Sequence, residues 1–330
     1  MEKTVKSSTC GGCGTVAESD SSTAAAHQAP IHDKASTPVS NGADAFTRTV
    51  DDVLIWRAQA LKGYPGNPFG VHFKEHENHV GVLTTAAPTP ALNRVLNVEL
   101  RDTSTVALFN EWFRASGAVP AYQVFAPVGR PPTTIQGFVK VTDWDHVLMK
   151  KENLDATAHE PAPAKAVTVT IASKDDAEPF TRVYAEAFNY PSKIAAPLCK
   201  SIEGLIGHRH VISYVAWLEG RAVSVGQLFL GRHGVAYLGS TGTIPAARGL
   251  GCQAILDQIR VKDAVKAGYS ALCRQVSLLS QSWRNAVKID FKAHYREELF
   301  APLAGIAARR SEVKHGTDKD KCCSVEMRKT

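Results

Sequence analysis

A strand-to-helix junction in the second half of the chain constrains the fold more than any other feature. A predicted strand, 235–243, is followed by Pro245. Gly249 and Gly251 then open a long predicted helix, 250–267. Proline stops strand pairing, and glycine lets backbone amides converge without interference from a Cβ atom. A helix N-terminus adds partial positive charge and unpaired N–H donors. The junction therefore predicts an anion-binding turn that suits a pyrophosphate.

Arg248 stands directly before the first glycine and can add a charge-assisted contact to a phosphate. Two better-known phosphate-binding motifs do not fit this segment. The Walker loop is excluded because no Gly-Lys-Ser/Thr follows. The dinucleotide fingerprint is excluded because its third glycine is missing and a strand meander, not a βαβ unit, comes before it. The plain alternative is that the two glycines only shape a turn.

The surrounding pattern predicts a mixed sheet. Strands are expected at 167–171, 210–218, 221–230, 235–243, 270–278 and 291–299, and helices at 176–188, 194–206, 250–267 and 282–290. This order mixes hairpins with a parallel connection, unlike the strict alternation of a doubly wound fold. The sequence therefore indicates an α+β protein.

The junction resembles the signature of the GNAT superfamily of acyltransferases, Arg/Gln-x-x-Gly-x-Gly/Ala. That signature commonly has an extra arginine before the first glycine and a proline three residues before that arginine. Pro245, Arg248, Gly249 and Gly251 match, whereas Ala246 stands in place of the leading Arg or Gln. The resemblance covers essentially all of 166–308.

A fainter copy of the same order precedes this unit. A helix is expected at 45–61, with strands at 71–73, 79–85, 93–100 and 122–126 and helices at 104–116 and near Thr133. Gly137-Phe138 matches the Gly-Phe that commonly opens the last strands of a GNAT domain, and the second copy has Asp290-Phe291 there. The chain therefore resembles tandem GNAT proteins: two GNAT-like domains, each a mixed, mostly antiparallel sheet flanked by helices. The first copy has no Arg-Gly-x-Gly and is expected not to bind CoA.

Composition divides the chain further. The predicted parts are a disordered tail (1–43), the degenerate GNAT-like domain (44–150), a linker (151–165), the acetyltransferase domain (166–308) and a disordered basic tail (309–330). The two tails contain few large apolar residues and cannot offset the entropy of ordering. The predicted linker, KENLDATAHEPAPAK, is rich in Pro, Ala and charged residues.

The resemblance implies a site for acetyl-CoA, as cosubstrate, between the fourth and fifth strands of the second domain. The pantetheine arm is expected on the backbone of Thr241 and Thr243, and a backbone amide there is expected to polarise the thioester carbonyl. The remaining contacts are expected from Arg248, Gly249, Leu250, Gly251, Cys252, Gln253 and Ser280.

The acid and the base are less clear in the sequence. Many GNAT enzymes protonate the leaving thiolate with a tyrosine, but Ala286 occupies that place, and Tyr295 lies just beyond. A base is needed because amines are mostly protonated at neutral pH. We expect Tyr237 to line the acceptor site, followed by His210. The alternatives are His208, Glu219 and His233, and each of these residues also has a plain surface or packing interpretation.

Other classes of function are less favoured. The net charge of +6, from 38 basic and 32 acidic residues, is spread without the aromatic-lined basic stripe of a nucleic-acid binder. No apolar run approaches the roughly 20 residues that span a bilayer, and no signal core follows the first residues, so no membrane contact and a cytoplasmic location are expected. No metal site is expected. Cys10 and Cys13 lie in a tail, and their sole distant partners are Cys322 and Cys323. The histidines at 72, 76 and 79 are interpreted as part of a solvated turn.

The sequence thus predicts transfer of an acetyl or other short acyl group from acetyl-CoA to an amine by direct attack. The amine is expected to belong to a small molecule. One alternative is a non-catalytic CoA-binding or regulatory protein, favoured by Ala246 and Ala286. Another is a purely structural role. The acceptor, the acyl length and the oligomeric state are left open.

Overall fold

The computed structural model describes residues 44–87, 89–131, 133–141, 146–154, 167–190 and 192–305. All of them fall in the same compact unit of the chain. The predicted tails and most of the predicted linker lie outside these residues, as do Cys10, Cys13, Cys322 and Cys323.

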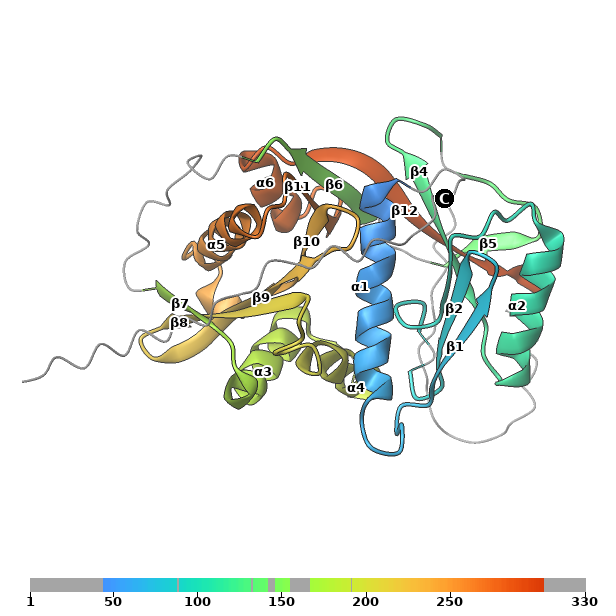
Figure 1. Cartoon of the computed structure of the whole chain (residues 1–330), viewed down its shortest axis with the longest axis horizontal. Helices are drawn as coiled ribbons and strands as arrows, with labels where there is room; N and C mark the ends of the chain where they lie inside the picture. The colour runs from blue at the N-terminus through green and yellow to red at the C-terminus, as the bar shows by residue number, and fades with distance from the viewer. Residues whose placement is uncertain are drawn as a thin grey trace, which may run out of the picture. The chain divides into compact units, whose positions relative to one another are not determined.

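The first half of the described chain consists of two helices and six strands (Figure 1). The elements in order are α1 (Ala45–Lys62), β1 (Val71–His76), β2 (His79–Thr84), β3 (Arg94–Leu96), α2 (Thr103–Ala115), β4 (Ala121–Pro127), β5 (Phe138–Lys140) and β6 (His146–Glu152).

Longer strands and four helices follow. These elements are β7 (Val167–Ile171), α3 (Ala177–Phe188), α4 (Ser192–Glu203), β8 (Val211–Leu218), β9 (Arg221–Leu230), β10 (Val235–Thr243), α5 (Cys252–Lys266), β11 (Ala271–Ser277), α6 (Gln281–Lys288) and β12 (Lys292–Pro302). Short 3-10 turns at Lys174–Asp176 and Pro245–Ala247 lead into α3 and α5.

The strands form one sheet in the order β1-β2-β3-β4-β12-β6-β11-β10-β9-β8-β7, with β5 paired to β12. Two neighbouring pairs, β3–β4 and β10–β11, are parallel, and the other described pairs are antiparallel. Each parallel pair is connected through a helix, α2 or α5, as a parallel crossover requires. The mixed, mostly antiparallel α+β architecture is therefore as predicted.

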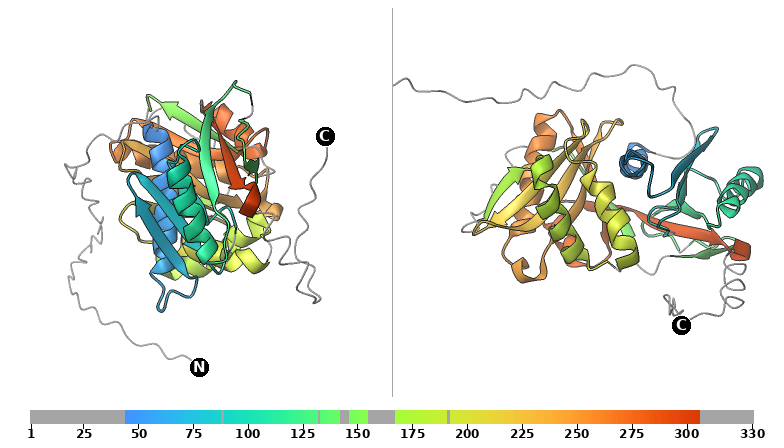
Figure 2. Two further views of the ribbon diagram at one scale, coloured as in Figure 1. Left: turned by 90° about the vertical axis from the view of Figure 1, so that its right-hand side faces the viewer. Right: turned by 90° about the horizontal axis from the view of Figure 1, so that it is seen from below.

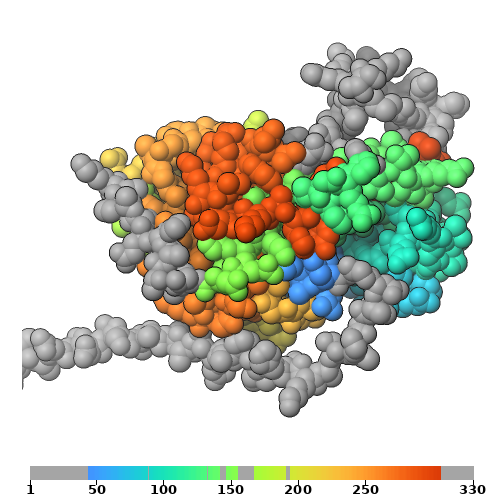
Figure 3. Space-filling view, turned by 90° about the horizontal axis from the view of Figure 1, so that it is seen from above, coloured from blue at the N-terminus to red at the C-terminus, as the bar shows by residue number. Residues whose placement is uncertain are grey.

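The order of the sheet is symmetric about its centre, where β12 lies beside β6. From β12 outward it reads β4, β3, β2, β1, and from β6 outward it reads β11, β10, β9, β8. The two halves exchange strands there, because β6 pairs with β11 and β12 pairs with β4. Figure 2 shows β12 extending between the halves, and in Figure 3 the green surface of β6 lies against the orange and red surface of the second half. Residues 151 and 152 of the predicted linker form the end of β6, while the predicted domain boundaries remain predictions.

The same backbone corner precedes the last strands of both halves. Gly137, before β5, has φ 82°, and Asp290, before Phe291 and β12, has φ 64°. A positive φ favours glycine, and aspartate is among the residues that tolerate it best. The Gly-Phe and Asp-Phe pairs found in the sequence therefore share a positive φ at their first residue.

Helix α1 lies between the two halves of the sheet (Figure 1). Asp44 begins it by accepting hydrogen bonds from the amides of Phe46 and Thr47, at 3.0 and 2.9 Å. One face of α1, including Trp56, packs against Phe229 and Tyr237 of the second half. The other, including Leu61, packs against β1 and β2. The helix therefore contributes to the core on both sides.

Three local predictions were wrong. The strand expected at 93–100 ends at Leu96, because Asn97 has φ 61° and leaves the extended conformation. No helix forms at residue 133 or its described neighbours. The strand expected at 71–73 continues to His76, so the turn is the two-residue Glu77–Asn78, with φ 52° at Glu77, and His76 pairs with His79 across a hairpin.

Candidate functional site

Strands β10 and β11 separate soon after they begin. Their parallel pairing covers Val235–Tyr237 opposite Ala271–Cys273. Beyond it, β10 stays paired to β9 and β11 stays paired to β6, so the two strands part while each keeps its other neighbour. We call this unpaired stretch, residues 238–243 of β10 and 274–277 of β11, the split. The gap expected between the fourth and fifth strands of the second domain is therefore present.

A β-bulge lies in β10 beside the split. The register with β9 shifts between Gly239 and Gly242, and Ser240 between them has φ 49°. Such a bulge re-aims backbone groups, and a non-glycine residue with positive φ costs free energy that its surroundings must offset. The Arg260 guanidinium, from α5, donates to the carbonyl of Gly239 at 3.2 Å and to the Thr241 hydroxyl at 2.8 Å. A buried side chain thus fixes the bulge from one face of the sheet.

The glycine turn lies at the C-terminal end of β10. Gly249 and Gly251 have φ of 83° and 81°, and a Cβ built on Gly249 meets nothing within 4 Å. Gly251 is the N-cap of α5, and no side chain caps this helix. The amides of the first turn of a helix have no partner within it. Residues 248–251 are exposed, so these donors face an open surface.

The N-terminus of the equivalent helix in the first half, α2, is capped, unlike that of α5. The side chain of Asp102, the N-cap of α2, accepts a hydrogen bond from the Thr105 amide at 3.1 Å. Hydrogen bonds from Ser104 and Thr105 hold the pKa of the Asp102 carboxyl below its usual range. The N-terminus of α2 already holds a carboxylate, whereas that of α5 does not. An anion would therefore find its site in the second half.

The structure places Arg248 beside the turn, with its side chain directed to neighbouring carbonyls. Nε donates to the carbonyl of Thr243 at 3.3 Å, and Nη2 donates to that of Ala187 at 3.0 Å. Both bonds are exposed and join α3 to the end of β10. The Thr243 hydroxyl lies 2.7 Å from that of Ser224.

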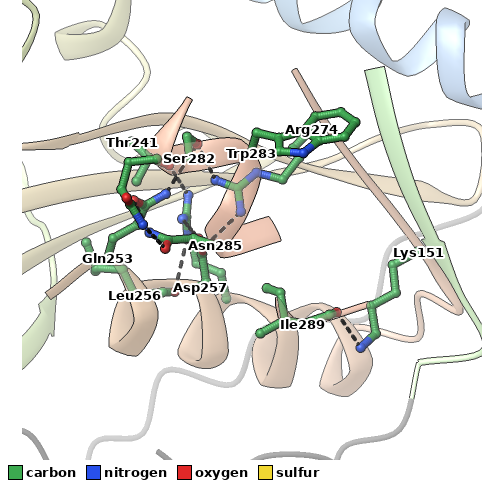
Figure 4. Close-up of polar contacts among 12 residues, drawn as sticks. Lys151, Thr241, Gln253, Leu256, Asp257, Arg274, Ser282, Trp283, Asn285 and Ile289 are labelled. Carbon is green, nitrogen blue, oxygen red and sulfur yellow. Dashed lines mark hydrogen bonds and ion pairs between the residues drawn. The ribbon is translucent and has the colours of Figure 1, made fainter. Parts of the chain in front are cut away.

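The remaining predicted cofactor residues connect α5 to α6. Gln253 donates to the Ser282 hydroxyl at 3.3 Å and accepts from the Asn285 amide group at 2.8 Å. The Ser280 hydroxyl caps α6 by accepting from the Trp283 amide at 3.1 Å. Cys252 is buried, and Leu250 is exposed. The two helices therefore begin close together on one face of the split (Figure 4).

The structure does not bring Tyr237 and His210 together. Tyr237 is buried, and its hydroxyl donates to Oε1 of Gln275 at 3.1 Å. Burial, with smaller effects from Cys273 and Glu297, raises the pKa of Tyr237 well above its usual value, so its hydroxyl is a proton donor at neutral pH. His210 stacks on Trp56, with ring centroids 5.2 Å apart, and Phe229 lies between that pair and Tyr237.

Burial also lowers the pKa of His210, and the cations of Arg209 and Arg232 lower it further. The imidazole is therefore neutral at pH 7, as a base requires. His210 lies just before β8, on the face of the sheet that carries α1.

At Ala286, the position of the usual tyrosine, the structure shows a fully buried methyl group in the core of the second half. Tyr295 lies elsewhere, because its hydroxyl donates to Asp44 at the start of α1, at 3.0 Å. Neither Ala286 nor Tyr295 therefore supplies an acid from α6.

Sequence reasoning missed a buried ionic cluster on α5 and β11. Asp257 binds both Arg260 and Arg274, and the Asp257–Arg274 bond is 2.8 Å long. The sequence signal that could have indicated the Arg260 site is Gly226, a glycine inside strand β9. A Cβ at this residue would lie 2.8 Å from the Arg260 guanidinium. No periodic pattern shows that a charged residue on an amphipathic helix faces inward.

Two other kinds of feature are absent from the described part of the chain. It contains no group of three or more His, Cys, Asp or Glu residues that could hold a metal ion. Nor does any described helix have the length and apolar character needed to cross a membrane.

Comparisons with known proteins bear on the fold. No model of a protein family matches the sequence, and no curated protein matches it. Solved structures do match. A GCN5-related N-acetyltransferase from Kribbella flavida is 15% identical and aligns over 82% of this chain and 99% of its own, with a TM-score of 0.53. A tandem GNAT protein from the clavulanic acid biosynthesis pathway is 13% identical and aligns over 77% of this chain and 94% of its own, with a TM-score of 0.52.

This chain has the GNAT fold. A functionally unknown conserved protein from Staphylococcus epidermidis shares it as well, with 10% identity, 71% and 95% coverage and a TM-score of 0.51. At these identities the likeness is one of fold. Within this GNAT fold, the split, the bulge and the uncapped start of α5 follow one another along the chain in the second half.

Proposed function

We propose that this chain is an acetyl-CoA-dependent N-acyltransferase whose second half binds the cofactor. The observation that carries the proposal is the start of α5, where two positive-φ glycines and an uncapped helix N-terminus follow a strand that has parted from its neighbour. Backbone donors and the helix dipole together favour a pyrophosphate there. An extended arm that continues from it has the unpaired edges of the split available.

The first half is proposed to be a degenerate GNAT copy without CoA. Its equivalent strand pair, β3–β4, is short, and the helix that connects these strands, α2, is capped by its own Asp102. Adding a pyrophosphate beside that carboxylate would bring like charges together. The duplication and the strand exchange then serve to build one stable sheet around one site.

The chemistry proposed is direct attack of a neutral amine on the thioester. Binding both reactants in one site supplies much of the rate, up to about 7–11 kcal/mol in favourable cases. A backbone amide near the bulge would stabilise the developing oxyanion. The acceptor is proposed to be the amine of a small molecule. Tyr237, whose hydroxyl stays protonated, lies nearest the split, and His210 is the candidate base.

One observation favours a second candidate, a CoA-binding protein without catalysis. Ala286 is fully buried in the core, and no acid from α6 replaces the expected tyrosine among the described residues. Such a protein would bind CoA equally well and turn nothing over.

Calorimetry separates these possibilities. The wild type is titrated with CoA and acetyl-CoA beside Gly249→Trp, which fills the open space in the turn. Gly129→Trp is the matched control, because Gly129 also has a positive φ, 92°, and no atom within 4 Å of an added Cβ. Binding by the wild type and by Gly129→Trp, but not by Gly249→Trp, supports the cofactor site. Binding without turnover on a broad amine panel supports the second candidate.

A further inference from the structure

The buried cluster of Asp257, Arg260 and Arg274, which we call the arginine cluster, has an unbalanced charge. The three side chains are at most 2% exposed. Two guanidinium groups share one carboxylate, so the cluster has a surplus positive charge. Burying an unpaired charge is costly, and such charges normally have a partner. The cluster therefore favours a further negative charge close to it.

The other contacts of Arg274 are neutral. Nη2 donates to the Ser282 hydroxyl at 3.3 Å, and the guanidinium lies 5.7 Å from the centre of the Phe291 ring. Its Nε is buried and has no hydrogen-bond acceptor. One donor of this guanidinium thus lacks a partner, and Asp257 is the sole carboxylate paired with it among the described residues.

Arg274 is also the first residue of the split on β11. Its neighbour Cys273 makes the last pair with β10, opposite Tyr237. Its guanidinium extends to the face that carries α5 and α6, and Figure 4 shows Gln253, Asp257, Ser282 and Asn285 gathered there. This is the face of Ala286, where the side chain of α6 provides no acid. A positive charge therefore stands at the vertex of the split on the side from which a proton donor is missing.

We propose that Arg274 stabilises the thiolate that leaves from acyl-CoA. The inference rests on the proposed function and adds a group to that site. The amine nitrogen bonds to the carbonyl carbon, the carbon–sulfur bond breaks, and its electron pair stays on sulfur. The amine proton passes to a base or to water, and Arg274 remains protonated throughout. The products are an amide, CoA thiolate and one proton.

Arg260 and Asp257 position Arg274 in this proposal. Asp257 holds Arg274 at 2.8 Å, and Arg260 binds the opposite side of Asp257 and the bulge of β10. The same cluster thus sets the separation of the two strands and the place of the charge.

The test measures the thiol pKa of bound CoA from the ultraviolet absorbance of its thiolate, with desulfo-CoA, which lacks the sulfur, as the blank. No acceptor amine is needed. The wild type is compared with Arg274→Gln and with Arg274→Lys, which keeps the charge. Arg284→Gln is the matched control, because it removes an exposed arginine from α6 that contacts Leu279 and Gln281.

An opposite charge within about 4–6 Å lowers the pKa of an acid by about one unit or more. We expect that shift for CoA bound to the wild type and to Arg284→Gln. Arg274→Gln should restore the pKa toward that of free CoA while binding desulfo-CoA as the wild type does, and Arg274→Lys should keep part of the shift. Folding is expected to survive, because Asp257 remains paired with Arg260.

An unshifted pKa in the wild type, or the same pKa in the wild type and in Arg274→Gln, would overturn the role of Arg274. Either result leaves the cofactor site intact, because CoA is bound in both. Failure of the wild type to bind CoA would instead overturn the proposed function and this inference with it. If Arg274→Gln does not fold, the thiol pKa of CoA bound to the wild type and to Arg274→Lys still tests the role of Arg274.

Discussion

The hydroxyl of Tyr237 donates a hydrogen bond to Oε1 of Gln275 across the split, at 3.1 Å. This bond joins β10 to β11 just beyond their last backbone pair, on the face covered by α1. On the other face, the arginine cluster connects Thr241 of the bulge to Arg274. The two strands are thus held apart at a defined separation by side chains on both faces.

Removing the Tyr237 hydroxyl should impair turnover and spare cofactor binding. We expect Tyr237→Phe to lower turnover by about tenfold or more, equivalent to ~1.4 kcal/mol, with CoA affinity unchanged. The reason is that the hydroxyl lies at the vertex of the split while the glycine turn holds the cofactor. The control is Tyr122→Phe, which removes a buried hydroxyl bonded to Val106 and Asn110 in the first half. Turnover of both variants is measured as release of the CoA thiol in the presence of an accepted amine. Equal turnover in Tyr237→Phe and in the wild type would remove Tyr237 from the site.

Gly226 and Arg260 should be energetically coupled. A Cβ at residue 226 would lie 2.8 Å from Nη1 of Arg260, a contact that side chains do not tolerate. We expect Gly226→Ala to destabilise the protein by about 1–3 kcal/mol as overpacking does. The same substitution in an Arg260→Met background should cost less, with a coupling energy of about 0.5–3 kcal/mol. Urea denaturation of the wild type, the two single variants and the double variant measures the coupling energy. Additive changes in the free energy of unfolding would contradict the contact.

Glu297 should make stability depend on pH in the acid range. Burial raises the pKa of this carboxyl, but the nearby Arg94 and His146 outweigh burial and lower the pKa from 4.5 to about 2. Because the folded pKa lies below the unfolded one, this stabilisation is complete above pH 4.5 and is lost as pH falls toward about 2.

The contribution is on the order of 3 kcal/mol. We therefore expect the free energy of unfolding of Glu297→Gln to fall less steeply than that of the wild type over this interval. Denaturation at a series of pH values measures the slopes. The control is Glu111→Gln, because Glu111 is an exposed residue in an ion pair with Arg114. Parallel curves for the wild type and Glu297→Gln would contradict the interpretation.

The fold was largely readable from the sequence where local signals and tertiary structure agree. The β8–β9 hairpin, the break at Pro245 and helix α5 lie within a few residues of their predicted positions. Each combines strong periodicity with a glycine or proline signal, so no distant contact was needed to define it. The wrong predictions near residues 97 and 133 fall in short segments, where one positive φ or an unformed turn decides the outcome.

The strand exchange could not be read from the sequence. Strand β6 has three consecutive buried apolar residues, Val147–Met149, in place of a simple alternation, and no local pattern states that it pairs with β11 rather than with the first half. The arginine cluster was hidden for a similar reason, since Asp257 and Arg260 lie on a helix whose charged residues read as solvent-exposed. Buried ion pairs form only when distant segments meet, here α5 and β11. The glycine turn was found because its signal lies in eight consecutive residues.

The most direct test of the central claim compares two side chains at Gly251. Both Asp and Asn tolerate the left-handed conformation of this residue, and they differ by one charge. We expect the wild type to bind CoA in calorimetry, and Gly251→Asp to bind it at least about tenfold more weakly than Gly251→Asn, because a carboxylate there repels a pyrophosphate. No CoA binding by the wild type, or equal affinities in the two variants, would contradict a phosphate site at the start of α5.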